Sequence, residues 1–204
     1  MRTIVWLPIA ALSLSFSACD KKDDAGTTSP STKSTGSAIA VDSAGKPLPK
    51  SPENIKRLDF PGTEEGAKAL LEAFLKPGAD QSDMTKSLRP SLADYDAIFV
   101  ADVVTEVKAK YEEQWNQDDY KISAKEGQTE LLLWQATTEE LRDGAVDANQ
   151  FPGGYKKIAD KLKPGLTFYR FKFVKPGDKH GMAFDGLVFV NGHWVMVSKP
   201  YRAM

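Results

Sequence analysis

An Asn-Gly pair at positions 191 and 192, set between two apolar runs, constrains the fold of this chain more than any other feature. Both central residues of a type I′ turn need a positive φ, and Asn-Gly adopts this conformation readily. A two-residue loop there pairs Val190 with His193, Phe189 with Trp194, Val188 with Val195 and Leu187 with Met196. The turn therefore predicts a β-hairpin and determines which of its residues share a face.

A third strand is predicted just before this hairpin. The apolar runs cover residues 166–174, 182–190 and 193–199, and Pro176, Gly177 and Asp178 favour a turn in the first connection. With a loop of six residues, we expect Phe173 to pair with Phe184, Phe171 with Gly186, Tyr169 with Val188 and Lys172 with Asp185. One face of this three-stranded meander then forms the core: Tyr169, Phe171, Phe173, Phe184, Val188, Val195 and Val197. A slip of one residue in the first hairpin would exchange the faces of its strand.

The opposite face of the predicted meander is apolar over half of its length. Its polar end carries Arg170, Lys172, Asp185 and Ser198. Its other end carries large apolar side chains: Phe168, Leu187, Phe189, Trp194 and Met196. Such a patch is typical of an interaction surface, so one hypothesis is that a second copy of the domain or a partner protein covers it, with Trp194 as the anchor. The alternative is that a short helix at 138–143 or 153–162 covers it from within the chain.

Helices are predicted ahead of the meander. Thr63 is expected to cap a helix whose apolar face is Ala67, Leu70, Leu71 and Phe74. A long helix is predicted from Ser91 to Trp115, with Asp94 completing a capping box and a bend near Phe99. Residues 120–123 and 129–136 are expected to form a hairpin, followed by brief helices at 137–141 and 155–162.

These elements predict an α+β fold, in which N-terminal helices pack on a curved antiparallel sheet that ends in a three-stranded meander. One domain at 58–204 has an ordinary size for a single core. The chain has 27 Lys and Arg residues against 28 Asp and Glu residues, and it contains no basic stripe. We therefore expect no nucleic-acid partner.

The composition changes before residue 58. Residues 20–54 are rich in Ser, Thr, Gly, Pro, Lys and Asp and contain no aromatic residue. Such a segment cannot bury enough apolar area to offset the entropy lost on ordering. We therefore expect residues 19–57 to be a disordered linker.

The first residues have the layout of a secretory signal peptide, predicted to span residues 1–18. Arg2 is positively charged, residues 4–16 are mostly apolar, and the segment ends in Phe16, Ser17, Ala18 and Cys19. The apolar run is shorter than the roughly 20 residues that a membrane-spanning helix needs. This ending resembles the lipobox of bacterial lipoproteins, with Phe16 where leucine is usual. The resemblance implies cleavage before Cys19, the only cysteine in the chain, and its acylation with chains such as palmitate.

A lipid anchor on Cys19 would hold the domain at the cell membrane, facing the periplasm or the exterior. More than one acyl chain satisfies the requirement for stable anchoring. Asp20 resembles the inner-membrane retention signal of enterobacterial lipoproteins. The choice between inner and outer membrane stays open.

The predicted order of helices and strands resembles the cystatin-like cone of the nuclear-transport-factor and polyketide-cyclase superfamily. The resemblance covers residues 60–204, is architectural and rests on no diagnostic motif. It implies a cone-shaped domain that can hold a cavity. Because enzymes, binding modules and dimerising scaffolds all use this fold, the resemblance does not select a function.

Two residues are weak catalytic candidates. Asp185 is the only acid inside the meander and is a candidate base, and a cross-strand ion pair with Lys172 is its structural alternative. His193 begins the last strand and is a candidate acid or base beside a nearby carboxylate, or else a structural histidine. His180 is expected in a solvated turn.

The remaining polar residues favour no particular chemistry. Asp94 is expected to cap a helix and Asp96 to lie on a solvated face. With two histidines and one cysteine, the chain is poorly supplied with ligands for a transition metal, so we expect no metal and no cofactor. No CxxC, HExxH, GxSxG, P-loop or GxGxxG motif is present.

Three functions stay open. The first is a non-catalytic, membrane-tethered binding or accessory domain of the cell envelope, working as a homodimer or with an envelope protein. The second is a hydrolase or isomerase with Asp185 or His193 in a cone cavity, and the third is a small-ligand carrier. Convergent polar groups in a closed cavity would favour the enzyme, whereas a filled core with an exposed apolar patch would favour the binding domain.

Overall fold

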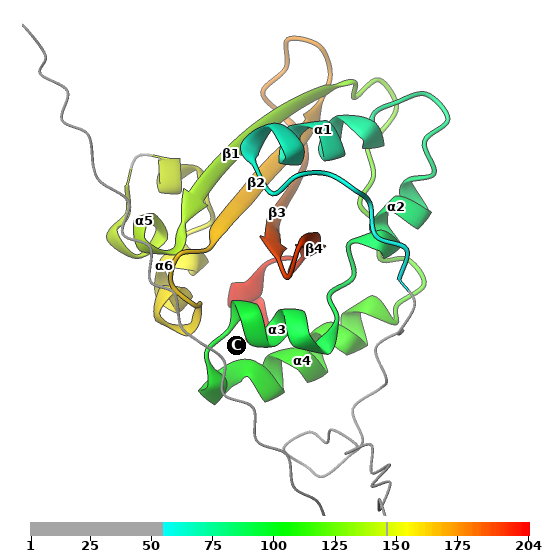
Figure 1. Ribbon diagram of the computed structural model, residues 1–204. Coiled ribbons are helices and arrows are strands. Elements are labelled where there is room, and N and C mark those ends of the chain that lie inside the picture. Colours follow the sequence, from blue (N-terminus) through cyan, green and yellow to red (C-terminus); the bar gives the residue numbers. More distant parts are fainter. Residues whose placement is uncertain (1–54, 146) are drawn as a thin grey trace, which may run out of the picture. The chain divides into compact units, whose positions relative to one another are not determined.

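The computed structural model describes residues 55–145 and 147–204, and Figure 1 shows how their elements are arranged. The predicted signal peptide, Cys19 and the linker up to residue 54 lie outside the described residues. The helices ahead of the sheet are α1 (Glu64–Phe74), α2 (Gln81–Ser87), α3 (Leu92–Ile98) and α4 (Ala101–Trp115). The strands are β1 (Glu130–Thr137), β2 (Thr167–Val174), β3 (Gly181–Val190) and β4 (His193–Met196). The predicted α+β class, with N-terminal helices and an antiparallel sheet, is confirmed.

Short helical elements fill the remaining connections. Between β1 and β2 lie α5 (Thr138–Asp143), η1 (Asp147–Gln150), α6 (Gly154–Ile158) and η2 (Ala159–Lys161), and η3 (Pro200–Arg202) follows β4. The two brief helices predicted from sequence correspond to α5 and to α6 with η2. Among the described helices, none combines the length and hydropathy that a bilayer span requires.

Helix α1 begins and packs as its sequence predicts. The Thr63 hydroxyl accepts a hydrogen bond from the Gly66 N–H at 3.2 Å. The predicted apolar face is fully buried: Ala67, Leu70, Leu71 and Phe74. The Phe74 ring lies 6.3 Å from that of Phe173 on β2, centroid to centroid, and Figure 1 shows α1 lying across β1 and β2. This side of the sheet is called the α1 face below.

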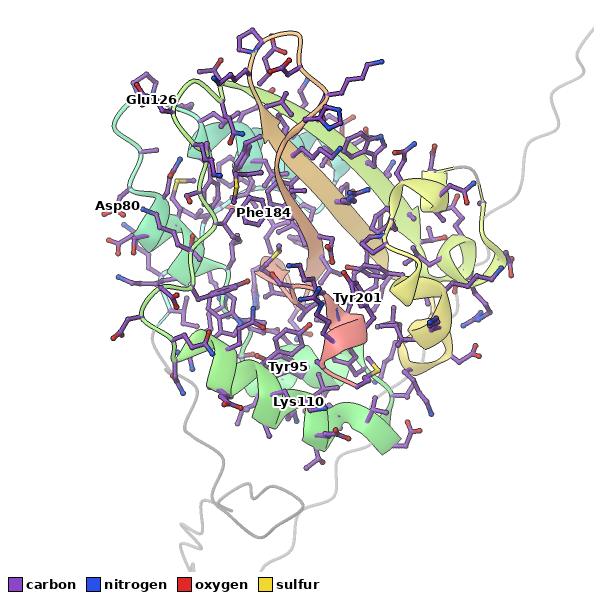
Figure 2. The ribbon with its side chains drawn as sticks, turned by 180° about the vertical axis from the view of Figure 1, so that it is seen from behind. Asp80, Tyr95, Lys110, Glu126, Phe184 and Tyr201 are labelled. Atoms are coloured by element: carbon purple, nitrogen blue, oxygen red, sulfur yellow. The ribbon has the colours of Figure 1, made fainter. Side chains whose placement is uncertain are left out.

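The chain between Ser91 and Trp115 forms two helices, so the prediction of one long helix is wrong. Phe99 is extended, with φ −108° and ψ 151°, and forms an isolated antiparallel bridge with Leu162. The Lys163 N–H donates to the Ile98 carbonyl at 2.8 Å, which gives one of the last carbonyls of α3 a partner outside the helix. The two helices remain packed, because Tyr95, labelled in Figure 2, stacks on Tyr111 of α4 with centroids 5.6 Å apart.

The sheet has the order β1-β2-β3-β4, and each strand is antiparallel to its neighbour. The predicted hairpin between residues 120–123 and 129–136 is wrong, because β1 pairs with β2 and residues 120–125 form no strand. The Ile122 N–H instead donates to the Thr85 hydroxyl oxygen at 3.0 Å. The backbone at Ile122 is therefore bonded to a side chain of α2 and not to a neighbouring strand.

The β3–β4 hairpin has the predicted turn and register. Asn191 and Gly192 have φ values of 50° and 80°, as a type I′ turn requires. All the predicted pairs are present: Leu187 with Met196, Val188 with Val195, Phe189 with Trp194 and Val190 with His193. β4 ends at Met196, three residues earlier than the strand predicted at 193–199.

The β2–β3 hairpin has a different register from the one predicted. Val174 pairs with Gly181, Phe173 with Met182, Phe171 with Phe184 and Arg170 with Asp185. These partners lie two positions earlier on β3 than expected, because the predicted pairing would need a longer loop than 175–180 allows. A register shift between Tyr169 and Arg170 then makes Gly186 an extra residue of β3. Tyr169 consequently pairs with Leu187, and Phe168 with Val188.

The bulge at Gly186 changes which residues share a face. Before the bulge, Phe171, Phe173 and Phe184 lie on the α1 face, as predicted. After it, Leu187, Phe189, Trp194 and Met196 continue that face, while Val188 and Val195 move to the opposite side. The predicted core face is therefore split between two sides of the sheet, and both sides are buried at the β3–β4 end. Because Tyr155 of α6 packs on Phe168 there, the second side is called the α6 face.

Candidate functional site

A row of three residues of different character crosses the α6 face. Trp134 of β1 pairs with Arg170 of β2, and Arg170 pairs with Asp185 of β3. The buried row below it is Ala136, Phe168 and Val188, and the row above it is Leu132, Lys172 and Ala183, which are half-buried or exposed. Trp134, Arg170 and Asp185, called the boundary row here, therefore mark where the covered half of this face ends.

Two cations of the open half gather on one aromatic ring. The Arg170 guanidinium carbon lies 5.8 Å from the Trp134 ring centroid, and the Lys172 ammonium nitrogen lies 5.5 Å from it. The Lys172 ammonium also donates to the Lys179 carbonyl at 3.2 Å. Over the described ranges, neither cation forms a salt bridge with a carboxylate. Trp134 thus holds two positive charges on an open sheet face.

Asp185 lies at the buried end of the boundary row and is 6% exposed. One of its oxygens, Oδ1, accepts hydrogen bonds from the Tyr155 hydroxyl at 2.9 Å and from the Lys199 N–H at 3.1 Å. Tyr201, labelled in Figure 2, covers the outer side of Tyr155 with ring centroids 5.6 Å apart. The expected ion pair between Asp185 and Lys172 is wrong, because the observed register places Ala183 opposite Lys172 and Arg170 opposite Asp185.

The surroundings of Asp185 change its acidity. Burial raises the pKa of the Asp185 carboxyl, and this outweighs the hydrogen bonds from Tyr155 and Lys199 and the charges of Lys199 and Arg170, which lower it. Burial, and then the charge of Asp185, raise the pKa of Tyr155 well above its usual value, so Tyr155 remains a donor. A carboxyl of this kind can accept and release a proton nearer to neutral pH than a solvated aspartate.

His193 lies beside a carboxylate, but not beside Asp185. Its Nε2 is 3.1 Å from Asp94 Oδ2, and its Nδ1 is 3.2 Å from the Asn191 carbonyl oxygen. Both ring nitrogens therefore have partners within the fold, whereas an acid or base needs one directed at a substrate. In this position His193 ties the β3–β4 turn to α3.

Asp94 is the centre of this second cluster and is fully buried. It accepts hydrogen bonds from the Ser91 N–H at 2.7 Å, from the Ser91 hydroxyl at 2.8 Å and from the Asn191 amide at 2.8 Å, and Arg57 lies 3.5 Å away. Burial raises the pKa of Asp94, but the hydrogen bonds from Asn191, Ser91 and His193 lower it by more, so its net pKa is below the usual range. The predicted cap is confirmed, and so is the solvent exposure of Asp96 and His180.

The five residues predicted as an exposed interaction surface do not form one. Phe168, Leu187 and Met196 are fully buried, Trp194 is 2% exposed, and Phe189 is half-buried. The Trp194 indole N–H donates to the Pro61 carbonyl at 3.2 Å, and Gly62 lies against the Phe189 ring. The segment ahead of α1 covers Trp194 and Phe189, and Tyr155 of α6 covers Phe168. The patch is therefore covered from within the chain, but the predicted helix at 153–162 covers only Phe168, and the other four residues lie on the α1 face.

Neither catalytic candidate lies in a described pocket. One pocket of about 500 Å³ is lined by residues 55–58 and α2, and one of about 520 Å³ by α1, the following turn and the start of β1. Neither is lined by Asp185 or His193. No group of three or more His, Cys, Asp or Glu side chains that could hold a metal ion was found in the described part of the chain.

Sequence reasoning placed Asp185 and Arg170 on one face but missed their direct pairing and missed Trp134 and Tyr155 beside them. The strand at 129–136 was expected, yet its pairing with β2 was not, so nothing placed Trp134 beside Arg170. Tyr155 is 30 residues away from Asp185, and no local pattern connects them.

Comparisons with protein-family models, with curated proteins and with solved structures found no match. Proposals about function therefore rest on the geometry described above and on the N-terminal sequence motif.

Proposed function

We propose that this protein is an envelope lipoprotein, anchored to a membrane through acylated Cys19, whose folded domain binds an anionic partner. The observation that supports binding is the pair of cations, Arg170 and Lys172, which are held over Trp134 and form no salt bridge with a carboxylate in the described residues. The N-terminal motif supports the anchor. Asp20 favours the inner membrane, with the domain facing the periplasm or the exterior.

The chemistry of the two cations indicates the partner's charged groups. A guanidinium binds a carboxylate or a phosphate through two parallel hydrogen bonds, and an ammonium adds a second positive point. Because the aromatic ring holds both cations in place, less side-chain entropy is lost when an anion binds. The partner is therefore expected to carry carboxylate or phosphate groups in series.

Binding can be tested on the chain from Asp20 to Met204, which contains every described residue. Polyglutamate and inorganic polyphosphate are titrated while tryptophan fluorescence is measured, because an anion at Arg170 changes the surroundings of Trp134. The Arg170→Ala, Lys172→Ala double variant should bind about tenfold more weakly or worse. A double variant with Lys175→Ala and Lys179→Ala, on the same hairpin but away from the ring, is the matched control.

The two probes separate the carboxylate and phosphate alternatives. Saturable binding that needs Arg170 and Lys172 but not the control lysines supports the proposal. Absence of binding by either polyanion, or an equal loss in both double variants, would sink it.

The anchor has a separate test. Cells expressing the full chain are labelled with palmitate, and the protein is followed through membrane fractionation. Label should enter the wild-type chain, and Cys19→Ala should abolish it and leave the signal segment uncleaved. Palmitate that still enters Cys19→Ala would contradict the anchor without affecting the binding proposal.

A second candidate function is acid–base catalysis by Asp185, as in a hydrolase or isomerase. It is favoured by one observation, a buried carboxyl with a raised pKa that accepts a hydrogen bond from Tyr155 at the edge of the open face. The test is a panel of ester, lactone and ketone substrates, with Asp185→Asn as the comparison. A turnover that persists unchanged in a folded Asp185→Asn protein would exclude this role.

A further inference from the structure

The edge strand β1 leaves part of its backbone without a partner. Thr138, which follows β1, donates its N–H to the Leu166 carbonyl at 2.9 Å in continuation of the β1–β2 pairing. Bonded and non-bonded positions alternate along an antiparallel pair, so residues 131, 133 and 135 direct their N–H and C=O groups away from β2. Within the described chain, no hydrogen bond to these outward groups is found.

β1 also lacks the features that usually protect an edge strand. Its sequence, Glu130–Thr137, contains no proline and no lysine, and its pairing with β2 has no bulge. Its central side chains are half-buried on both faces of the sheet: Leu131, Leu132, Leu133 and Trp134. An edge of this length and composition favours pairing with another strand.

The other edge strand is shorter, and one of its outward groups has a partner. β4 has four residues, and the Met196 N–H donates to the Leu88 carbonyl at 2.8 Å. Figure 1 shows β4 among the helices and β1 on the outside of the sheet. β1 is therefore the more open edge of this sheet, although η1 packs against this strand.

We propose that a second copy of this chain pairs with β1, antiparallel and centred on Leu133. In this register all the outward residues meet outward residues: Leu131 faces Gln135, Leu133 faces Leu133, and Gln135 faces Leu131 of the second copy. On the α6 face, Leu132 lies beside Trp134 of the second copy, so two half-buried apolar side chains cover each other. Glu130 faces Ala136, so no like charges are opposed.

The register follows from the backbone. A centre on residue 132 would also place outward residues opposite one another, but Gln135 would then face Thr129, which lies outside β1. A centre on 134 would place Leu131 opposite Thr137. A centre on 135 would require the Thr137 N–H, which already donates to Glu140 at 2.7 Å. The two-fold arrangement gives one continuous sheet of both copies and is isologous, as most homodimers are.

This inference does not depend on anion binding, because it rests on the edge of β1 and not on Arg170 or Lys172. If both hold, the dimer places two cationic α6 faces side by side on one sheet. A polyanion could then bind both copies, which would raise its avidity without a new contact.

The register can be tested by disulfide cross-linking in the chain from Asp20 to Met204, which has no native cysteine. In the proposed dimer, the two copies of Leu133→Cys have Cα atoms about 5.5 Å apart, within disulfide range. Leu131→Cys lies on the same face and edge, but its two copies are displaced by about 13 Å along the strand. Oxidation should therefore link Leu133→Cys and leave Leu131→Cys unlinked.

Association itself is measured by sedimentation. The wild-type chain should sediment as a dimer, and Leu132→Glu should shift it to the monomer. The new carboxylate would face Lys172 within its own chain, which maintains the fold, but it would lose water against Trp134 of the second copy. Leu132→Thr, which is neutral and suited to a strand, is the matched control and should remain dimeric.

Several outcomes would overturn the proposal. They are a monomeric wild-type chain, a cross-link that forms at position 131 and not at 133, or a Leu132→Glu variant that is folded and still dimeric. A monomer whose β1 amides resist hydrogen exchange would also overturn it and would identify residues 20–54 as the strand's occupant. If Leu133→Cys fails to fold, the comparison of Leu132→Glu with Leu132→Thr decides alone.

Discussion

Asp94 provides a quantitative test of how this fold is held together. The carboxylate is fully buried and joins three separate segments: the start of α3 through Ser91, the β3–β4 turn through Asn191, and β4 through His193. Arg57, from the segment ahead of α1, adds a positive charge at 3.5 Å. Asp94→Asn keeps the size of the side chain and removes its charge, so it isolates the electrostatic part of these contacts.

The expected loss of stability can be worked out bond by bond. Asparagine can still accept through its oxygen, and Asn191 can rotate its own amide to accept from the new amide group. The hydrogen bonds therefore survive without the charge, and each falls from about 1.5–3 kcal/mol to about 0.5–1.5 kcal/mol. Four such bonds lose about 4 kcal/mol, and release from burying a charge offsets part of this. We expect Asp94→Asn to lower the free energy of unfolding by about 2–3 kcal/mol.

The assay is urea denaturation at neutral pH, with an unchanged dependence on denaturant as the sign that the folded state is intact. Asp96→Asn is the matched control, because Asp96 is exposed on the same helix and pairs with Lys108 at 2.7 Å. Exposed ion pairs contribute at most about 1 kcal/mol. Equal losses in the two variants would refute the role assigned to Asp94.

The same variant has a defined pH dependence. Because the folded-state pKa of Asp94 is lowered, its contribution to stability is complete above the usual aspartate pKa of about 3.9 and is lost as pH falls through the lowered value. The stability difference between wild type and Asp94→Asn should therefore be constant near neutral pH and shrink below about pH 4. A difference that grows on acidification would contradict the assigned direction.

Three further outcomes are expected. Trp194→Ala should cost about 3–5 kcal/mol in the same assay without changing the sedimentation of the chain, because Trp194 is core and not an interface. Gly186→Ala should cost about 2 kcal/mol or more, since Gly186 has a φ of 96° and an added Cβ would lie 2.0 Å from the Val197 carbonyl oxygen. A free energy of unfolding close to that of the wild type would show that a glycine is not required at the bulge. Because the folded-state pKa of Asp185 is raised, the stability of the wild-type protein should decline as pH rises from about 4 through that pKa. Asp185→Asn should not show this decline, and an identical pH profile in both proteins would exclude the raised pKa.

The accuracy of the sequence predictions varied with how locally each feature is determined. The β3–β4 register was correct because a two-residue type I′ turn allows only one pairing. The β2–β3 register was wrong because the predicted pairs need a longer loop than residues 175–180 provide. The faces beyond Gly186 were wrong because this glycine was treated as an ordinary strand residue, although a glycine inside a strand is a known sign of a bulge. The capping box at Ser91 was correct, but the end of α3 depends on Leu162, which lies far along the chain.

In the candidate site, too, sequence reasoning failed where a residue depends on partners far away in the chain. Asp185 was recognised as the one acid of the meander, and His193 as a histidine that needs a carboxylate. Their true partners, Tyr155 and Asp94, are 30 and 99 residues away, and no periodicity or motif connects such distant positions. The apolar patch around Trp194 was judged by the rule that one face of an antiparallel sheet is solvated. That rule fails here because both faces are covered at the β3–β4 end.

With both faces covered at that end, the accessible sheet lies at its other end, around β1 and the open half of the α6 face. Trp134 belongs to both surfaces proposed there, because its ring holds Arg170 and Lys172 and its strand forms the open edge. Trp134→Ala should therefore weaken both polyanion binding and self-association. Arg170→Ala should weaken binding and leave the dimer intact. Leu132→Glu should abolish the dimer and, because its carboxylate would face Lys172, should also weaken polyanion binding. If Trp134→Ala, folded by its melting curve, affects neither measurement, the two surfaces do not meet at this residue and the joint arrangement is wrong.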